Sequence, residues 1–253
     1  MTAIVPTRIA AIVPTRVGVV VPTRVGVVVP TRIAAIIPVG TLEGAKTRLG
    51  GTLDAEERQD LAERLLTRTV EAALATDGID DVLVVSPDRE VLRRAADLGA
   101  RTLRQRSVGL NAGLNEGRQD VVAGGAEAIL VLPIDLPFVT AEAVAAVLEP
   151  LIVGEGVVGA AVVGAAIPHH GAFVADVVLV TDRHGSGTNA LALRPPHAIA
   201  FAFGPGSRHA HRVAAEAIGA RYVEVDGPLA FDLDTPDDLV VIGSMAPEGI
   251  GAG

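Results

Sequence analysis

The sequence predicts a single α/β domain whose sheet is mostly parallel and carries helices on both faces. The chain has 253 residues, 49% of them hydrophobic, and a mean hydropathy of +0.45, which is enough to bury one large core. From residue 52 onward, apolar runs of strand length alternate with segments of helical periodicity. The run 128–132 is continuously apolar, which is typical of a central parallel strand that is buried on both faces.

An eight-residue repeat occupies positions 1–38, and each copy reads as one short strand that ends at proline. This period is too short for the known solenoid repeats. The fourth copy leads into a different loop, so we predict that residues 33–37 form the first strand of the domain. The expected organisation is a repetitive β-prone extension over 1–31, one folded domain over 32–243 and a flexible tail over 244–253.

The remaining elements follow in the order expected for an α/β fold. Asp54 is a candidate N-cap for a helix with apolar positions between 61 and 74, which Gly78 would end. The apolar stretch 151–180 gives no clear element boundaries. The other predicted elements are a strand at 82–86, a helix at 88–98, a short strand near 102, a helix from 111, a strand at 128–132, a helix at 141–148, a helix at 208–218 and a strand at 221–225.

Composition excludes several classes of protein. A net charge of −9, with five Phe, one Tyr and no Trp, argues against a nucleic-acid partner. The absence of cysteine excludes disulfides, thiolate nucleophiles and Cys-ligated metals, and predicts a cytoplasmic protein. Proline and arginine interrupt the repeat, and Glu155 interrupts the stretch 151–168, so we predict no membrane partner. The oligomeric state does not follow from the sequence.

Three aspartates are candidate ligands of Mg²⁺. Asp135 directly follows the strand at 128–132, and ligands of open parallel sheets bind at the carboxyl ends of strands. Asp232 and Asp234 are two residues apart, so in an extended segment both side chains project from one face. Hard carboxylate oxygens suit Mg²⁺. The alternative is that Asp135 caps the next turn and that a helix starts at Thr235, which accounts for residues 235–238 but leaves Asp232 unexplained.

One loop and two glycine-rich segments are candidate phosphate sites. Lys46 is the single lysine among 21 Lys and Arg residues, and it lies with Arg48 in a glycine-containing loop after the first strand. The segments 185–188 and 204–207 bring backbone amides and a hydroxyl together, and Ser207 is a candidate N-cap for the next helix. Glycine and serine are also common turn formers, and Lys46 also fits an ordinary surface position. His209 and His211 fit a surface helix better than a zinc site.

The motifs PVGTLEGAKTRL, VVSPD, GLN, LPIDLP, GSGTNALALRPP, FGPGS and DLDTPDDL, in this order, resemble the 2-phospho-L-lactate or phosphoenolpyruvate guanylyltransferases of coenzyme F-420 biosynthesis. The resemblance covers residues 33–239 and implies a single-domain nucleotidyltransferase fold. It also implies that GMP passes from GTP to the phosphate of a three-carbon phospho-acid, with release of pyrophosphate.

Roles for individual residues follow from this resemblance and from the candidates above. We expect Lys46 and Asp135 to be catalytic. The expected binding residues are Asp135, Asp232 and Asp234 for Mg²⁺, Thr188, Gly204 and Ser207 for the acid, and Lys46, Arg48 and Asn111 for GTP.

The chain also departs from the family pattern. Gly40 stands where the family usually has lysine, the segment 154–175 is longer and more apolar than expected, and the repeat has no counterpart. Two other functions stay open, the second of which Gly40 favours. One is a metal-dependent glycosyltransferase that uses the DLD segment, and the other is a nucleotide-binding relative without activity.

Overall fold

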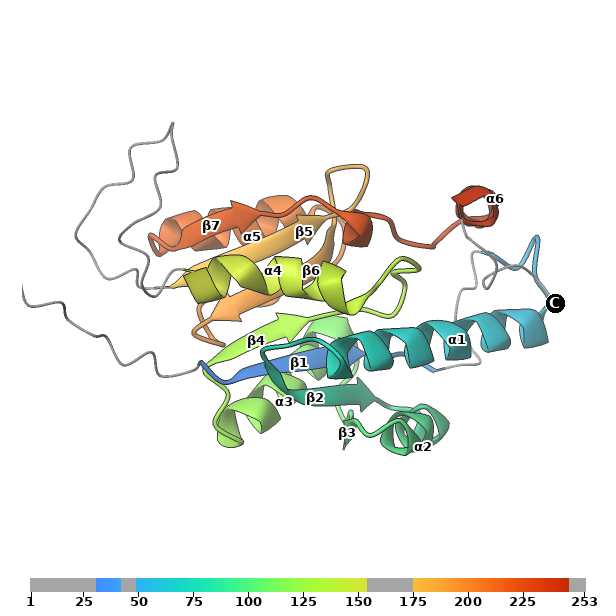
Figure 1. Ribbon diagram of the computed structural model, residues 1–253, viewed down its shortest axis with the longest axis horizontal. Coiled ribbons are helices and arrows are strands. Elements are labelled where there is room, and N and C mark those ends of the chain that lie inside the picture. Colours follow the sequence, from blue (N-terminus) through green and yellow to red (C-terminus); the bar gives the residue numbers. More distant parts are fainter. Residues whose placement is uncertain (1–30, 42–48, 154–174, 246–253) are drawn as a thin grey trace, which may run out of the picture.

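The computed structural model describes residues 31–41, 49–153 and 175–245. They form a seven-stranded sheet in the order β3-β2-β1-β4-β6-β5-β7 with helices on both faces (Figure 1). The predicted fold class is confirmed, whereas most of the repeat and the segment 154–174 lie outside the described residues. The elements are β1 (Ile33–Pro38), α1 (Ala55–Leu74), β2 (Ile79–Ser86), α2 (Arg89–Asp97), β3 (Arg101–Arg104), α3 (Leu110–Ala123), β4 (Ala128–Val131), α4 (Ala141–Val153), β5 (Asp176–Thr181), β6 (Thr188–Arg194), α5 (Ser207–Ala217), β7 (Arg221–Glu224), the short 3-10 helix η2 (Pro228–Ala230) and α6 (Pro236–Met245).

The strand directions change in the middle of the sheet. β1 pairs in parallel with β2 and β4, and β2 pairs in parallel with β3. β6 runs antiparallel to both β4 and β5, and β7 is parallel to β5. Because Val131 pairs with Leu191, the start of β6 lies beside the residues that follow β4. Segments far apart in the sequence therefore meet at one edge of the sheet.

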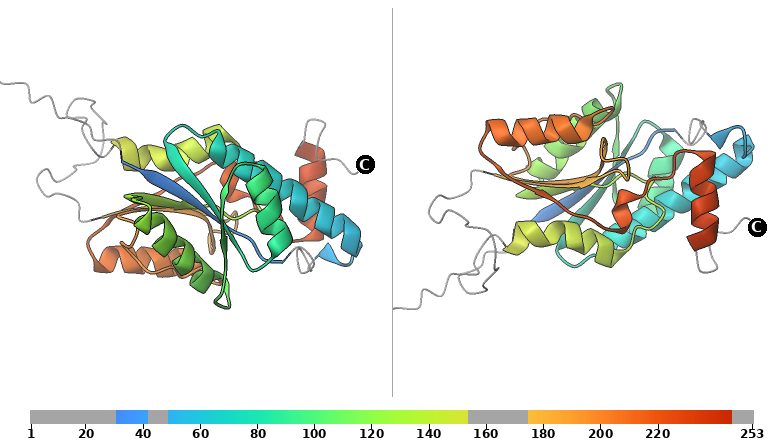
Figure 2. Two further views of the ribbon diagram at one scale, coloured as in Figure 1. Left: turned by 90° about the horizontal axis from the view of Figure 1, so that it is seen from below. Right: turned by 90° about the horizontal axis from the view of Figure 1, so that it is seen from above.

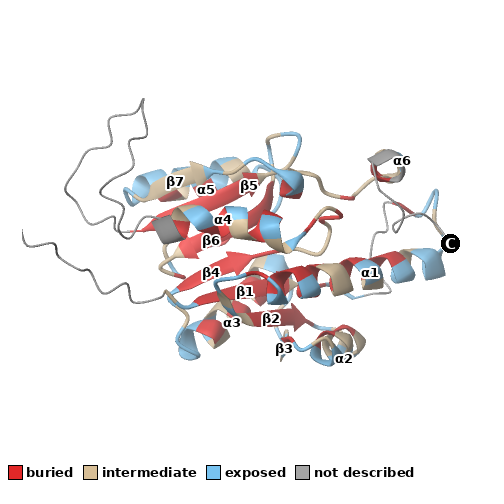
Figure 3. Ribbon diagram, in the orientation of Figure 1, coloured by how far each residue is buried: buried red, intermediate tan, exposed pale blue. Residues whose placement is uncertain are grey.

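The core has one layer on each face of the sheet. Successive residues of β1 are buried on opposite faces, Ala35 with α1, α2 and α4 and Ile36 with α3 and α5. The views from below and above show the two helical layers (Figure 2), and the central strands are buried throughout (Figure 3). This double burial explains the continuous apolar runs in the sequence.

The start of α1 follows the predicted capping chemistry. The Asp54 side chain accepts a hydrogen bond from the Glu57 backbone N–H at 2.9 Å, and the Glu57 side chain accepts one from the Asp54 N–H at 2.7 Å. The prediction that Gly78 ends α1 is wrong. The helix stops at Leu74, because Gly78, with φ of 92°, belongs to the turn that leads into β2.

Helix α3 lies unusually close to the sheet at Gly117. A Cβ atom there would be 2.8 Å from Cγ2 of Val85 and 3.0 Å from Cγ2 of Ile36, closer than such atoms approach without a shift. The absence of a side chain at Gly117 thus sets the distance between α3 and strands β1 and β2.

Within the described part of the chain, no helix has the length and apolarity that would take it across a membrane.

Candidate active site

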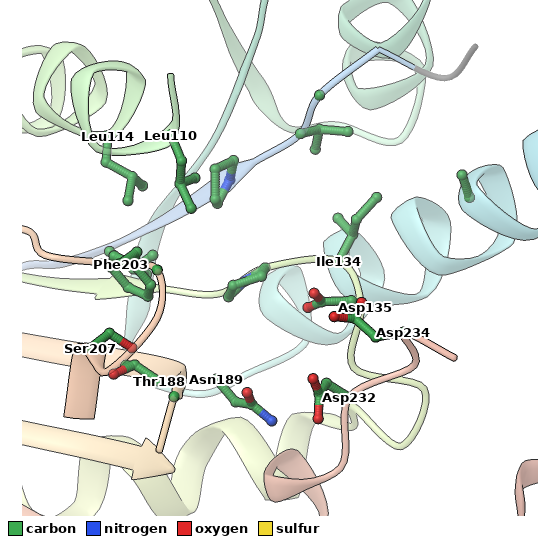
Figure 4. Close-up of a pocket in the computed structure, with 18 of the residues that line it drawn as sticks. Leu110, Leu114, Ile134, Asp135, Thr188, Asn189, Phe203, Ser207, Asp232 and Asp234 are labelled. Carbon is green, nitrogen blue, oxygen red and sulfur yellow. The ribbon is translucent and has the colours of Figure 1, made fainter. Parts of the chain in front are cut away.

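A pocket of about 730 Å³ lies at the edge where β1 and β4 end and β6 begins. Its walls come from the segments after β1 and β4, the start of β6, the start of α5 and the segment before α6 (Figure 4). The lining residues that the sequence predicted as site residues are Asp135, Thr188, Gly204, Ser207, Asp232 and Asp234. The fold thus brings together candidates that are up to about a hundred positions apart.

One side of the pocket carries the three predicted carboxylates. The Leu233 backbone N–H donates to the Asp135 carbonyl oxygen at 2.8 Å, which joins the segment before α6 to the end of β4. Leu233 is fully buried, so Asp232 and Asp234 on either side of it face the pocket, as their spacing predicts. Figure 4 shows the three carboxylates in the same region of the pocket.

The electrostatics of this side suit a cation. Burial raises the pKa of Asp232, and the nearby carboxylates of Asp234 and Asp182 raise it further, against the opposing effect of Arg183. A bound cation would relieve this repulsion. Among the described residues, no three carboxylate or imidazole groups are close enough to hold one metal ion by themselves. The donor set fits a hard ion such as Mg²⁺, which usually takes one or two carboxylates and completes its shell with water and phosphate oxygens.

The segment that carries Asp234 is held by an ion pair that the sequence did not predict. The Asp238 carboxylate accepts from the backbone N–H groups of Asp234 at 2.8 Å and Thr235 at 2.7 Å. Arg183 forms an ion pair with Asp238, and its guanidinium lies 4.7 Å from the centre of the Phe231 ring. Arg183 therefore links the loop between β5 and β6 to the carboxylate side of the pocket.

The opposite side of the pocket is built for an anion. Thr188 is the first residue of β6 and Ser207 the first of α5, and their hydroxyl groups lie at the same end of the pocket (Figure 4). The prediction that Ser207 caps α5 is wrong. Gly206 occupies the cap position with φ of 73°, a left-handed conformation that glycine adopts freely, so Ser207 belongs to the first helical turn. The helix start, with its partial positive charge, therefore faces the pocket.

The loop before Thr188 is fixed by its own hydrogen bonds. Asp182 accepts from the Ser186 backbone N–H at 2.7 Å and from the Ser186 hydroxyl at 3.2 Å. A Cβ atom at Gly187 would lie 2.8 Å from the Asp182 carboxylate, so a larger residue here would have to displace the side chain that holds Ser186. Arg208 donates to the Gly185 carbonyl oxygen at 2.9 Å and ties the loop to α5.

Asn111 holds the pocket wall from α3. Its side-chain amide donates to the Phe203 carbonyl oxygen at 3.0 Å and accepts from the Phe203 N–H at 2.9 Å. Phe203, Leu110 and Leu114 form an apolar wall on the side of the pocket that carries Thr188 and Ser207 (Figure 4). These contacts place Asn111 behind the wall, and its predicted contact with GTP stays a prediction.

The predicted cations of the first loop, Lys46 and Arg48, lie outside the described residues. Thr41 and Gly40, which precede this loop, line the pocket. A Cβ atom at Gly40 would meet nothing within 4 Å, so the position is open. No Lys or Arg is found among the pocket-lining residues within the described ranges.

His211 is a buried residue that the sequence reading placed on a surface helix. Its exposed fraction is 0%, and its ring contacts Thr188. The signal was present in the spacing, because Ser207, His211 and Ala215 recur every four residues and all three are buried on one face of α5. Because these residues are polar or small, the sequence pattern did not indicate that this face of α5 is buried.

Comparisons with known proteins agree on one family. The family described as guanylyl transferase CofC like matches residues 33–245. The phosphoenolpyruvate guanylyltransferase of Rubrobacter xylanophilus is 46% identical over 199 residues, which are 78% of this chain and 87% of that protein. The phosphoenolpyruvate guanylyltransferase of Sphaerobacter thermophilus is 41% identical over 210 residues, or 82% of this chain and 91% of that protein.

Solved structures share the fold at low sequence identity. A protein assigned as a nucleotide-diphospho-sugar transferase from Desulfovibrio desulfuricans G20 matches with a TM-score of 0.63 and 15% identity, over 84% of this chain and 86% of that chain. Likeness at this identity establishes the fold alone. The fold by itself does not separate nucleotide transfer from sugar transfer.

Proposed function

Because the chain belongs to the CofC-like guanylyl transferase family, we propose that it transfers GMP from GTP to the phosphate of a three-carbon phospho-acid. Phosphoenolpyruvate is the acid in the names of the relatives, and 2-phospho-L-lactate carries the same carboxylate and phosphate. The proposed products are pyrophosphate and a diphospho-guanosine ester for coenzyme F-420 biosynthesis. We place this reaction in the cytoplasm.

The observation that carries the proposal is the division of the pocket into two chemically different ends. Hydroxyl groups and the start of α5 lie at one end, where they suit the phosphate of the acid. Carboxylates lie at the other end, where they suit a cation that accompanies the triphosphate. A reaction that joins an acidic phosphate to the α-phosphate of GTP needs both ends in one pocket.

The proposed reaction needs positioning more than acid–base chemistry. An oxygen of the acceptor phosphate attacks the α-phosphorus of GTP, and the bond from that phosphorus to the bridging oxygen of pyrophosphate breaks. The attacking phosphate is already an anion, so no general base is required. Thr188 and Ser207 would hold this phosphate, while Asn111 and Phe203 keep the wall beside it in place. The protein thereby sets the line of attack.

Divalent metal fits the carboxylate end. Asp135, Asp232 and Asp234 would hold it together with water and phosphate oxygens, since the carboxylates alone do not complete a site. When bound, Mg²⁺ would neutralise charge on the triphosphate. The backbone holds the segment before α6 against this end of the pocket, because the Leu233 N–H donates to the Asp135 carbonyl oxygen.

The proposed reaction needs positive charge near the leaving pyrophosphate, and the loop after β1 carries the candidate residues for it. Thr41 lines the pocket immediately before this loop, and Leu49 is fully buried immediately after it. Both ends of the loop are therefore anchored in the domain. We assign Lys46 and Arg48, which the loop carries, to the phosphates of GTP.

A product assay tests the proposal. The full-length protein is incubated with GTP, Mg²⁺ and, in separate reactions, phosphoenolpyruvate, 2-phospho-L-lactate and 3-phosphoglycerate. We expect pyrophosphate release and a guanosine diphosphate ester, detected by mass, with phosphoenolpyruvate as the best acid. Hydrolysis of a sugar nucleotide without pyrophosphate release would instead support a glycosyltransferase. GTP binding without turnover would support a relative without activity.

A further inference from the structure

His211 lies behind the acid end of the pocket and is not one of the described pocket-lining residues. Its Nε2 atom is 3.0 Å from the backbone nitrogen of Ala202, and its Nδ1 atom is 3.1 Å from the Thr188 hydroxyl oxygen. The ring also packs edge-on against the Phe203 ring, with centroids 5.2 Å apart. One nitrogen therefore contacts the backbone, and the other contacts a pocket residue.

These two contacts fix the position of the proton on the ring. A backbone N–H can only donate, so Nε2 must accept from Ala202. A neutral imidazole carries one N–H, which is then on Nδ1 and donates to the Thr188 oxygen. Burial lowers the pKa of His211 to about 4, so the ring is neutral near pH 7.

The direction of this hydrogen bond determines what Thr188 offers to a ligand. Its oxygen accepts from His211, so its own proton is not used in that bond. Within the described residues, the His211 ring is the only hydrogen-bond partner of this hydroxyl group. Thr188 is almost buried and lines the pocket beside Ser207. The Thr188 proton is therefore available to a ligand in the pocket.

We propose that His211 is a positioning residue that makes the Thr188 hydroxyl a hydrogen-bond donor to the phosphate of the acid substrate. A donor at this position binds phosphate or carboxylate oxygens. The inference rests on the proposed function for the identity of the acid. It adds a residue outside the pocket wall to the determinants of acid binding.

Two substitutions of His211 separate this role from simple core packing. The amide of asparagine can place an N–H near the Nδ1 position, so His211→Asn keeps a donor for Thr188 and loses the acceptor for Ala202. The longer glutamine reaches the Nε2 position, so His211→Gln keeps the acceptor and loses the donor. Both variants remove the ring, and their melting temperatures report the packing loss.

The readout is the KM for each substrate in the pyrophosphate assay. In His211→Gln we expect the KM for phosphoenolpyruvate to rise about 10-fold or more, with the KM for GTP nearly unchanged. In His211→Asn we expect the KM for the acid to stay within about 3-fold of the wild type. His209→Gln, on the exposed side of the same helix, is the matched control and should change neither value. Equal acid KM values in the two His211 variants would overturn the proposal.

A double-mutant cycle shows whether His211 acts through Thr188. In a Thr188→Val background the hydroxyl group is absent, so His211→Gln should cause no further rise in the acid KM. An additional rise of the same size as in the wild-type background would contradict the proposed route.

Two measurements keep the proposal testable without turnover. Nitrogen-15 NMR of the imidazole groups, with the His211 signal assigned from its loss in His211→Asn, should show a proton on Nδ1 at pH 7. Calorimetry should show weaker phosphoenolpyruvate binding in His211→Gln than in the wild type. If no acid yields product, the proposed function fails while these two results still stand. A proton on Nε2, or no phosphoenolpyruvate binding by the wild type, would overturn the role of His211.

Discussion

At the scale of single residues, the pocket depends on residues that other segments hold in place. The Asp135 backbone carbonyl accepts from the Leu233 N–H, and the Thr188 hydroxyl group contacts the His211 ring. Such links reduce the freedom that a polar group loses when it binds a ligand. Changes at these positions should therefore separate chemistry from folding.

Asp135→Asn should abolish most turnover and leave the fold intact. The change removes a negative charge at nearly constant volume, and we expect kcat to fall about 100-fold or more. The melting temperature should move by less than about 4 °C, because the backbone bond from Leu233 to Asp135 does not involve the side chain. Asp77→Asn, at an exposed position, is the control. Retained activity with a lower melting temperature would instead assign Asp135 a structural role.

Gly40→Lys should strengthen GTP binding. The position lines the pocket, and a Cβ atom there meets nothing within 4 Å. The described part of the pocket lining contains no Lys or Arg. A lysine that reaches the triphosphate should lower the KM for GTP about 10-fold. Gly40→Gln adds a side chain of similar length without the charge and should have little effect. If both variants behave alike, the triphosphate gains no contact from this position.

At the scale of elements, the sequence predicted five of the six described α-helices and five of the seven described strands, and it offered α6 only as the alternative to a metal role. It did not place β5 and β6, because the stretch 151–180 is apolar without a period, and the strand at Thr188 follows a glycine-rich loop directly. The antiparallel direction of β6 depends on pairing with distant β4 and β5, which no local pattern encodes. The carboxylates could be predicted, because their positions at a strand end and two residues apart are local features of the sequence. The contacts of Arg183 with Asp238 and of His211 with Thr188 join distant segments and could not be predicted.

Gly117→Ala should move α3 away from the sheet and destabilise the protein. The added Cβ would overlap the methyl groups of Val85 and Ile36, and overpacking of this kind costs about 1–3 kcal/mol. The higher helix propensity of alanine offsets up to about 1 kcal/mol of this loss. We expect a lower melting temperature and, because Asn111 on α3 holds Phe203, a weaker binding of the acid.

The control for this change is the double variant Gly117→Ala with Val85→Ala. Removal of the valine methyl groups makes room for the new Cβ, so the double variant should be more stable than the sum of the two single effects predicts. Strictly additive losses of stability would show that the close approach at Gly117 is not the cause.

At the scale of the whole molecule, the described residues account for one complete sheet with both faces covered. The first strand starts at Ile33. The residue before it, Arg32, is hydrogen-bonded to the start of β4, because its carbonyl oxygen accepts from the Glu127 N–H at 2.8 Å and the Ala128 N–H at 3.1 Å. Residues before Thr31 lie outside the described residues. Among the described residues, the buried core begins at Ile33.

Deletion of residues 2–31 should leave activity and melting temperature nearly unchanged. The truncated chain keeps Arg32, the strand β1 and the loop that carries Lys46. Differential scanning calorimetry and the product assay check this expectation. If the earlier copies of the repeat formed a packed layer, each buried Val or Ile would contribute about 1.5–3 kcal/mol, and the truncated chain would melt at a clearly lower temperature.

The reversal of direction between β4 and β6 has a consequence for how such enzymes diversify. In the proposed function, the carboxylate end combines Asp135, which follows β4, with Asp232 and Asp234, whereas the acid end is lined by residues within 187–207, which come after the reversal. Substitutions that reshape the acid side leave the backbone of the first half of the sheet untouched. If the proposed function holds, substitutions within one short stretch of the gene can change the acceptor while Asp135, Asp232 and Asp234 stay in place.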